Sequence, residues 1–458
     1  MSFSSPIFLF GLLPWFCLAA WMSKNRIHGR KTILFAGNII FYIWGGIGGF
    51  LFVILYSFLI WLLSMITRKR RNQKNFFPLS IILAVSPLLY VKYVSFFVHN
   101  LNALLNLNLK APAVFIPIGI SFFTFEAVSL LVDLRTGSIP ANPTFPDIFL
   151  YLTFLPVVSS GPITRYSVFE QGLRHPCEEG IIPATERIVL GLCKKVLVAD
   201  KIAPLANYYF NGVAADSSFS MMGLWIGSAA FSLQLYYDFS GYTDMAIGIG
   251  KLLGFELPEN FDHPYIAKSI SEFWRRWHIS LSRWFRDYIY IPMGGNRCSV
   301  RRHILNLMTV WLLTGIWHGA DWTFVIWGIG YFILLVSEKY VSVMKRLSRK
   351  WYGHIYTLFC VNLLWVLFRA ENVSAAEKYI AGMFRLSGDI LPEQYAVRFL
   401  PYLLVAMIMC LPWKSYLQER LNKQWVQTGK RAMILLLGVL AICAVINSNY
   451  APYIYGAF

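Results

Sequence analysis

The stretch FWRRWHISLSRWFRDYIYIPMGGNR, residues 273–297, combines five arginines and one histidine with a dense set of aromatic side chains. One set of apolar residues within it recurs at alternating intervals of three and four: Trp274, Trp277, Leu281, Trp284 and Tyr288. That spacing corresponds to one face of an α-helix, and the arginines fall outside that face. Because clustered arginines are costly inside a bilayer, we predict an amphipathic helix near 269–290 that lies at the membrane interface and does not span it.

The composition of the whole chain is that of a membrane protein. Of its 458 residues, 57% are hydrophobic and 14% are charged, whereas soluble proteins average about 25% charged residues. The net charge is +18, and the basic residues cluster between apolar runs, at 24–31, 68–74, 345–350 and 423–431. Such clusters are typical of loops on the cytoplasmic side of a membrane. We therefore expect membrane lipid as a partner and no nucleic acid.

Apolar runs approaching the length that crosses a bilayer, about 20 residues, recur along the sequence. The candidate segments are 5–22, 32–47, 49–66, 76–97, 114–134, 147–163, 185–207, 219–237, 239–254, 304–318, 321–337, 352–369, 398–413 and 432–448. Some are short or interrupted by Pro and Gly. We therefore predict an all-α, polytopic integral membrane protein with about 11–13 transmembrane helices and additional re-entrant or interfacial helices.

The basic segments also predict the sidedness of the chain. If 24–31 and 68–74 both lie in the cytoplasm, the two spans between them are consistent with that placement, and the N-terminus lies outside. Counting from 345–350 toward the C-terminus places the last residues outside as well. Residues 1–22 carry no Lys or Arg, so we interpret them as a retained helix and not as a signal peptide.

Three carboxylates fall inside apolar runs: Glu126, Asp238 and Asp244. Acidic side chains at membrane depth are costly, and they usually face a cavity or pair with another group. Two interpretations stay open from the residues alone. The carboxylates either serve a polar pathway through the protein, or they neutralise neighbouring arginines and cap helix ends.

A second histidine-containing stretch, LLTGIWHGADW at 312–322, lies between two long hydrophobic runs. Imidazole is suited to removing a proton from a hydroxyl near neutral pH, and Gly319 beside His318 would allow another group to approach closely. His318 is therefore a candidate general base, and a packing or hydrogen-bonding role is the alternative. For His278, which borders the aromatic face, we weigh orientation of a substrate against simple capping of that face.

The signatures of several common enzyme classes are absent from the sequence. It has no GxSxG elbow, Walker A loop, HExxH motif or GxGxxG turn, which argues against ATP-driven transport and against serine- or zinc-dependent hydrolysis. The seven cysteines are scattered without a CxxC pair. Neither a disulfide framework nor a zinc site is indicated, and we expect no bound metal or cofactor.

Several segments together resemble the membrane-bound O-acyltransferase family, and within it the bacterial branch that O-acetylates alginate and peptidoglycan. Besides 273–297 and LLTGIWHGADWTFVIWG, they are IPIGISFFTFEAVSLLVD (116–133), SSGPITRY (159–166), GLCKKVLVADK (191–201), LYYDFSGYTDMAIGIGKLLGF (235–255) and PENFDHPYIAKSISEFWRRWHISLSRW (258–284). The resemblance covers essentially the whole chain. It implies one membrane domain, 1–458, with N-terminal helices (1–110), a catalytic core (111–340) and C-terminal helices with an external tail (341–458).

In this family an acyl thioester is made in the cytoplasm and its acyl group is delivered across the membrane through a central tunnel. The resemblance therefore implies catalytic roles for His318, as general base, and for His278, with acetyl-CoA or an acyl carrier-protein thioester as co-substrate. The acceptor would be an extracytoplasmic polysaccharide, reached through an acetyltransferase partner of the SGNH type, and the location a bacterial cytoplasmic (inner) membrane. A D-alanyl transferase for teichoic acids and a non-catalytic glycan channel or transporter are the alternatives.

The same resemblance implies further functional residues. We expect donor or substrate binding by Arg275, Arg276, Trp277, Arg283, Asn306, Trp317 and Asp238, with lipid-head binding as the alternative for the arginines. The chain ends in PYIYGAF, which resembles an aromatic C-terminal motif whose tyrosine is proposed to accept the acyl group. That tyrosine would be Tyr455, and an aromatic membrane anchor is the alternative.

Overall fold

The computed structural model describes residues 3–22, 27–70, 76–139, 142–177, 180–348, 350–386, 390–413 and 424–447, and these contain helices and no strand. The chain forms two compact units. The first comprises residues 1–188 and 243–258, and the second comprises 189–242 and 259–458. The predicted all-α class is confirmed.

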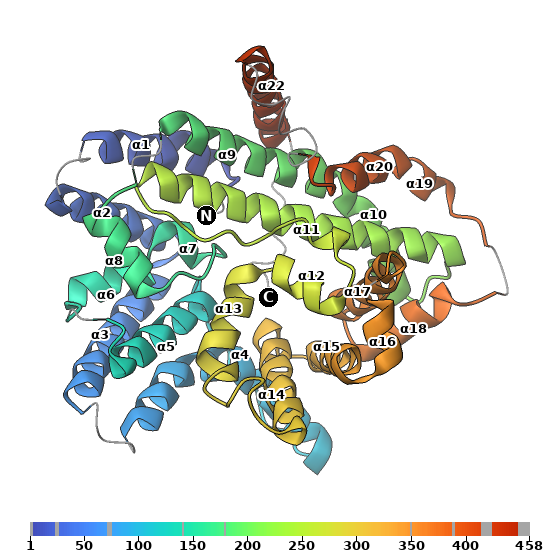
Figure 1. Ribbon diagram of the computed structural model, residues 1–458, viewed down its shortest axis with the longest axis horizontal. Helices are drawn as coiled ribbons and strands as arrows, with labels where there is room; N and C mark the ends of the chain where they lie inside the picture. The colour runs from blue at the N-terminus through green and yellow to red at the C-terminus, as the bar shows by residue number, and fades with distance from the viewer. Residues whose placement is uncertain are drawn as a thin grey trace. The chain divides into compact units, whose positions relative to one another are not determined.

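The first unit is built from the N-terminal helices. They are the π-helical turn η1 (Phe8–Leu12), α1 (Leu13–Met22), α2 (Ile27–Trp44), α3 (Ile47–Lys69), α4 (Phe76–Leu105), α5 (Ile120–Thr136), α6 (Phe145–Leu152), α7 (Leu155–Val158), α8 (Tyr166–Arg174) and most of α9 (Ile181–Cys193). The helix α3 packs against α2, α4, α5 and α6, which are labelled around it in Figure 1.

The second unit contains the stretches that carry the predicted chemistry. Its elements are η2 (Lys194–Ala199), α10 (Asp200–Ala214), most of α11 (Met221–Leu252), η3 (Pro264–Ile266), α12 (Ile270–Arg276), α13 (Ile279–Phe285), η4 (Arg286–Tyr290), α14 (Val300–His318), α15 (Trp322–Tyr340), α16 (Ser342–Leu347), α17 (Gly353–Arg369), α18 (Val373–Met383), α19 (Gln394–Val397), α20 (Leu400–Met409) and α22 (Gln424–Asn447). The antiparallel neighbours α14 and α15 make the most extensive helix–helix contact.

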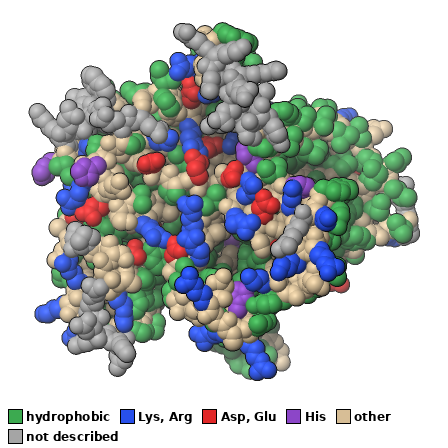
Figure 2. All heavy atoms as spheres, viewed as in Figure 1, with side chains coloured by type: hydrophobic (Ala, Val, Ile, Leu, Met, Phe, Trp, Pro, Cys, Tyr) green, Lys and Arg blue, Asp and Glu red, His purple; other side chains and the backbone are tan. Residues whose placement is uncertain are grey.

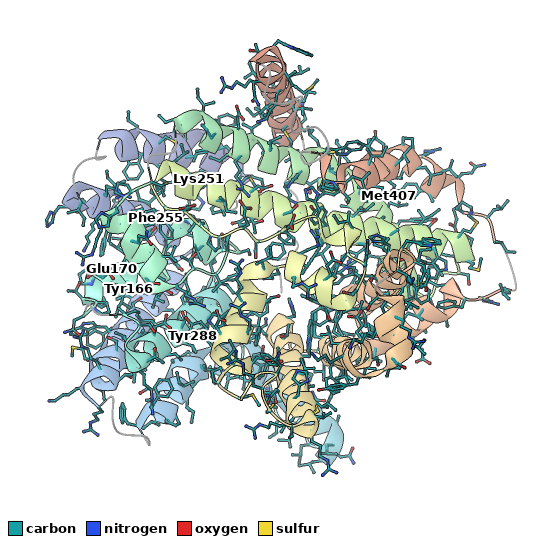
Figure 3. The ribbon with its side chains drawn as sticks, viewed as in Figure 1. Tyr166, Glu170, Lys251, Phe255, Tyr288 and Met407 are labelled. Carbon is teal, nitrogen blue, oxygen red and sulfur yellow. The ribbon has the colours of Figure 1, made fainter. Side chains whose placement is uncertain are left out.

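Several helices have the length and composition of membrane spans. Among the described residues four qualify: α3, α4, α15 and residues 425–447 of α22. Shorter apolar helices occur at 8–18, in α17 and in α20. The helix α20 leaves Leu404, Val405 and Met407 about half exposed, and hydrophobic side chains cover this side of the second unit (Figures 2 and 3). Apolar surface of this kind is stable in contact with lipid, and the protein is a multi-pass membrane protein.

Two of the predicted spans, 219–237 and 239–254, are a single uninterrupted helix, α11. The prediction divided them at residue 238, and that division is wrong. Gly241 instead permits close packing, because a Cβ there would lie 2.6 Å from the carbonyl oxygen of Gly191. By contrast, the predicted span 147–163 is divided into α6 and α7.

One buried arginine stabilises the first unit from within. The Arg30 guanidinium donates hydrogen bonds to the carbonyl oxygens of Gly172, Leu173 and Leu253, at 2.7–3.0 Å. These oxygens lie at the C-terminal ends of α8 and α11, where helix carbonyls lack intrahelical partners. The guanidinium also lies over the ring of Phe255. Arg30 therefore fixes two helix ends with one side chain.

Candidate functional site

The predicted amphipathic helix near 269–290 is interrupted at His278, so its continuity was predicted wrongly. α12 ends at Arg276, His278 adopts a left-handed backbone conformation with φ of 43°, and α13 begins at Ile279 (Figure 1). The apolar residues of the predicted face are nevertheless all buried: Trp274, Trp277, Leu281, Trp284 and Tyr288. The prediction that these residues face the core is confirmed, although the helix that carries them is interrupted.

Asn260 explains the bend. Its backbone oxygen accepts the N–H of Ile279 at 3.0 Å. Its side-chain oxygen accepts the N–H and the hydroxyl of Ser280, at 3.1 and 2.9 Å. The first amides of α13 are therefore satisfied by a residue outside the helix, in place of the carbonyls of a preceding turn. This compensates for the left-handed conformation at His278, which is unfavourable for a side chain of this kind.

The same oxygen determines the tautomer of His278. Nδ1 of the ring lies 3.2 Å from Asn260 Oδ1, and that atom must be an oxygen because it accepts the backbone N–H of Ser280. Nδ1 therefore carries the proton, and Nε2 is the basic nitrogen of the neutral ring. Complete burial lowers the pKa of His278 to about 3. The imidazole is thus held neutral and in one orientation.

His318 lies at the C-terminal end of α14 within an aromatic enclosure. Its ring meets Trp317, Trp327 and Phe368 edge to face, at centroid distances of 4.8, 4.9 and 5.1 Å. The side chain is 3% exposed. Gly319 does permit a close approach, as predicted, and the approaching group is Phe324: a Cβ at position 319 would lie 2.0 Å from its ring. His318 is consequently shielded from bulk water.

The two histidines lie close together. The indole of Trp317 contacts both rings, with centroids 6.2 Å from His278 and 4.8 Å from His318. His278 also meets Phe239 edge to face at 4.8 Å. The structure thus brings together the two histidines that the sequence singled out, and Trp317 is their shared neighbour.

A pocket of about 550 Å³ lies beside these residues in the second unit. It is lined by Ser271, Trp274, Arg275, Ile279, Leu281, Ser282, Arg283, Phe285, Arg286, Tyr290, Leu307, Val310, Trp311, Thr314 and Leu335. The lining contains three arginines and no acidic residue. Thr314 lies on α14 four residues before His318, hence about one helical turn away. The pocket combines an apolar wall with a positive charge suited to an elongated, anionic ligand.

Comparison with known proteins identifies the family. The membrane-bound O-acyltransferase family matches residues 74–373, more than half of the chain. The chain belongs to this family. It is 33% identical to a probable alginate O-acetylase AlgI of Pseudomonas putida, with 100% of both chains covered. It is 31% identical to a peptidoglycan O-acetyltransferase of Helicobacter pylori, covering 100% of this chain and 97% of that one.

A more distant relative is a teichoic acid D-alanyltransferase of Bacillus subtilis, 28% identical over 65% of this chain and 78% of the other. The predicted family and the prediction of an enzyme are confirmed, and the protein is an O-acyltransferase. The matched segment includes both histidines and the pocket.

The structure separates the other predicted site residues of the acyltransferase into two groups. Arg275 and Arg283 line the pocket. Arg276, although adjacent to Arg275, forms ion pairs with Asp262 at 2.9 Å and with Glu272 at 3.0 Å. Trp277 is buried and stacks on Phe273 with a centroid distance of 5.5 Å. Arg276 and Trp277 therefore hold the helices in place around the pocket.

The remaining predicted residues have identifiable surroundings. Asn306 is buried and donates from Nδ2 to the carbonyl oxygen of Gly295 at 3.0 Å, which fixes the turn after η4. Asp238 forms an ion pair with Lys195 at 2.8 Å. This agrees with the interpretation that its carboxylate neutralises a neighbouring cation, although that cation is a lysine and not an arginine. Asp244 pairs with Arg187 at 2.8 Å. Tyr455 lies outside the described residues.

Sequence reasoning missed two contributors to the site, Asn260 and Lys195. Asn260 lies in an irregular segment where no periodicity marks it, and its role depends on a contact across 18 residues. Lys195 is almost fully buried in the π-helical η2, between Asp200 at 2.7 Å and Asp238. Two signals could have identified Lys195. It lies among apolar residues, and the carboxylate of Asp238, buried in another apolar run, needs a cation as its partner.

Proposed function

We propose that this acyltransferase takes an acetyl group from a thioester made in the cytoplasm and passes it across the membrane for O-acetylation of an extracytoplasmic polysaccharide. The observation that carries the proposal is the position of His318. It is a shielded imidazole one helical turn beyond Thr314, and Thr314 lines a pocket rich in arginine.

His318 acts in this proposal as the general base for the attacking hydroxyl. A thioester is already activated, so the enzyme needs a base, positioning and exclusion of water. A well-placed base contributes about 10²- to 10⁴-fold in rate. The aromatic enclosure of Trp317, Trp327 and Phe368 excludes water from the ring. The proton leaves the acceptor hydroxyl for the imidazole as the C–O bond forms. The C–S bond then breaks, and the thiolate takes the proton back from the imidazolium and leaves as the free thiol.

His278 has a different role in the mechanism. With Nδ1 engaged by Asn260, the Nε2 of the neutral ring can accept a hydrogen bond but cannot donate one. We therefore assign His278 the orientation of the acceptor or of Trp317, whose indole its ring contacts. His318 is then the residue that carries the proton.

The pocket is proposed to hold the donor, with acetyl-CoA as co-substrate and no bound cofactor. Arg275 and Arg283 line it without a neighbouring acidic lining residue, and guanidinium groups are suited to phosphate. Acetyl is favoured over D-alanyl because relatives named as alginate and peptidoglycan O-acetylating enzymes match the whole chain at 31–33% identity, against 28% over 65% of it for the D-alanyltransferase.

The proposal also includes sidedness and a partner. The basic segments predict that both termini lie outside the cytoplasm. On that side of a bacterial inner membrane an SGNH-type acetyltransferase would receive the acetyl group, with Tyr455 as the acyl relay. Export of acetyl groups by Tyr455→Phe would be compared with that of the unaltered protein; undiminished export would rule out the relay.

The decisive experiment gives radiolabelled acetyl-CoA to the purified protein, the SGNH-type partner and a polysaccharide acceptor, and measures the label on the protein and on the polysaccharide. His318→Ala and His318→Gln should abolish acetyl transfer while the protein keeps its thermal unfolding temperature. The control His99→Ala changes an exposed histidine on α4 and should transfer at the unaltered rate. Transfer that survives both His318 variants would show that the base lies elsewhere, and a channel without chemistry would show no transfer in any variant.

A further inference from the structure

Three side chains beside the pocket form a hydrogen-bonded chain that the proposed function does not use. Nε2 of His303 lies 2.8 Å from the hydroxyl of Tyr290, and Nδ1 lies 2.6 Å from the hydroxyl of Tyr340. His303 is 5% exposed and Tyr340 is 40% exposed. Tyr290, on η4, also lines the pocket. Residues from η4, α14 and α15 therefore meet at one imidazole.

We propose that Tyr290 is a donor-binding residue whose hydroxyl hydrogen-bonds a phosphoryl oxygen of the thioester donor, and that His303 and Tyr340 are positioning residues that orient this hydroxyl. The inference rests on the proposed function, because it assigns the end of the pocket that holds the anionic head of the donor.

A neutral imidazole donates through one nitrogen and accepts through the other, and the proposal assigns the tautomer of His303 in which Nδ1 accepts. When the exposed Tyr340 donates its proton to Nδ1, Nε2 carries the ring proton and donates it to the oxygen of Tyr290. The O–H of Tyr290 is then directed away from His303 and into the pocket, available to an anion. An N–H on the phenol oxygen also polarises the O–H, which strengthens the hydrogen bond it donates.

The surroundings keep His303 neutral. Burial lowers its pKa, and the charge of Lys339 on α15 lowers it further. Arg302, the residue before His303, has its guanidinium engaged by the carbonyl oxygen of Met293 at 3.3 Å. Among the described residues, the hydrogen-bond partners of the ring are the two phenols. The described partners of the ring therefore include no carboxylate that would hold it in the charged form.

The position of Tyr290 fits the head of the donor and not its acyl end. His303 and His318 are 15 residues apart on α14, which corresponds to about 22 Å along the helix axis. The pocket follows the same helix from Leu307 to Thr314. A ligand with its thioester near His318 and its phosphates near Tyr290 must therefore be long and flexible, with a negative charge at the far end. A nucleotide joined through a pantetheine arm has that form.

The test compares two donors that share the reacting end and differ in the head. Acetyl-CoA carries phosphates, and acetyl-pantetheine carries none. Tyr290→Phe should raise KM for acetyl-CoA on the order of 10- to 100-fold, the range of a hydrogen bond to a charged group, with kcat unchanged. KM for acetyl-pantetheine should stay as in the unaltered protein. His303→Gln and Tyr340→Phe should raise KM for acetyl-CoA in the same selective way, by smaller factors.

The control Tyr402→Phe removes an exposed phenol from α20 and should leave both donors unaffected. An equal rise of KM for both donors in Tyr290→Phe, or a fall in kcat alone, would show a structural role and overturn the inference while the proposed function stands. An unchanged KM for acetyl-CoA would also overturn it. If the unaltered protein transfers acetyl from neither donor, the proposed function fails, and the inference fails with it.

Discussion

Asn260 Oδ1 lies 3.2 Å from Nδ1 of His278, and the same oxygen accepts the backbone N–H of Ser280. One amide therefore controls both the backbone at the break between α12 and α13 and the protonation pattern of a buried imidazole. Trp317 contacts both His278 and His318. By orienting His278, Asn260 therefore also affects the packing around His318.

Replacing Asn260 by alanine should destabilise the protein and impair transfer. The variant leaves the N–H and hydroxyl of Ser280 and the ring N–H of His278 without their acceptor, and each buried unsatisfied group costs about 1–3 kcal/mol. Thermal unfolding in detergent and acetyl transfer would be measured together. Asn100→Ala, which loses one hydrogen bond to Phe96 on α4, is the matched control. An Asn260→Ala protein as stable as this control would contradict the capping role.

The buried His278 should make the protein sensitive to acid. Its pKa is lowered by burial to about 3, whereas in the unfolded chain it is near 6.5. Between pH 6.5 and pH 3, His278 is therefore protonated in the unfolded state and neutral in the folded state. Stability should be full above pH 6.5 and fall by up to about 1.4 kcal/mol per pH unit as the pH drops toward 3.

Unfolding temperatures between pH 8 and pH 5 would measure this dependence. His278→Gln removes the group, so its stability should vary less with pH, and the difference between the two curves isolates His278 from other histidines. His99→Gln, at an exposed position, should follow the unaltered protein. Parallel curves for the unaltered protein and His278→Gln would show that the pKa of His278 is the same in the folded and the unfolded protein.

Removing Lys195 should be more damaging than removing the whole buried ion pair. Lys195 Nζ lies 2.8 Å from Asp238 and 2.7 Å from Asp200, and the Asp238 side chain is almost fully buried. Lys195→Met removes the cation that pairs with the buried Asp238 carboxylate, and removing one partner of a buried ion pair typically costs about 3–5 kcal/mol. The double variant Lys195→Met with Asp238→Asn should recover much of the loss in unfolding temperature. Additive losses would show that the two side chains do not act as a pair.

The sequence predicted burial better than it predicted backbone path. The intervals between Trp274 and Tyr288 identified five side chains that are all buried, because periodicity reports which residues face the core. The break at His278 was missed because it depends on Asn260, which is distant in sequence. The helix α11 was predicted as two spans because sequence alone does not distinguish a glycine that ends a helix from one, such as Gly241, that admits a neighbouring backbone.

The candidate site was also predicted only in part: its two histidines were identified, and the roles of its arginines were not. His278 and His318 are recognisable as unusual residues in unusual contexts, and the structure brings them together at Trp317. The roles of neighbouring arginines are not separable by composition, since Arg275 and Arg276 share charge, size and context. Only the positions of Asp262 and Glu272 distinguish a pocket residue from a structural one.

Arg275 and Arg276 should therefore respond differently to the same substitution. Arg275→Gln removes a charge that lines the pocket, so it should raise KM for acetyl-CoA by roughly 10-fold, as expected for loss of a charged hydrogen bond, and leave the unfolding temperature unchanged. The effect should shrink at high salt, where screening already weakens the attraction. Arg283→Gln should behave like Arg275→Gln.

Arg276→Gln should lower the unfolding temperature with little change in KM. The Arg276 guanidinium donates hydrogen bonds to the carboxylate of Glu272 on α12 and to the carboxylate and carbonyl oxygens of Asp262. These contacts are partly exposed, so the loss should be modest. Steady-state kinetics at two salt concentrations and thermal unfolding would be recorded for all three variants. If Arg276→Gln raises KM as much as Arg275→Gln without loss of stability, the pocket extends beyond its described lining and the two arginines act as one anion site.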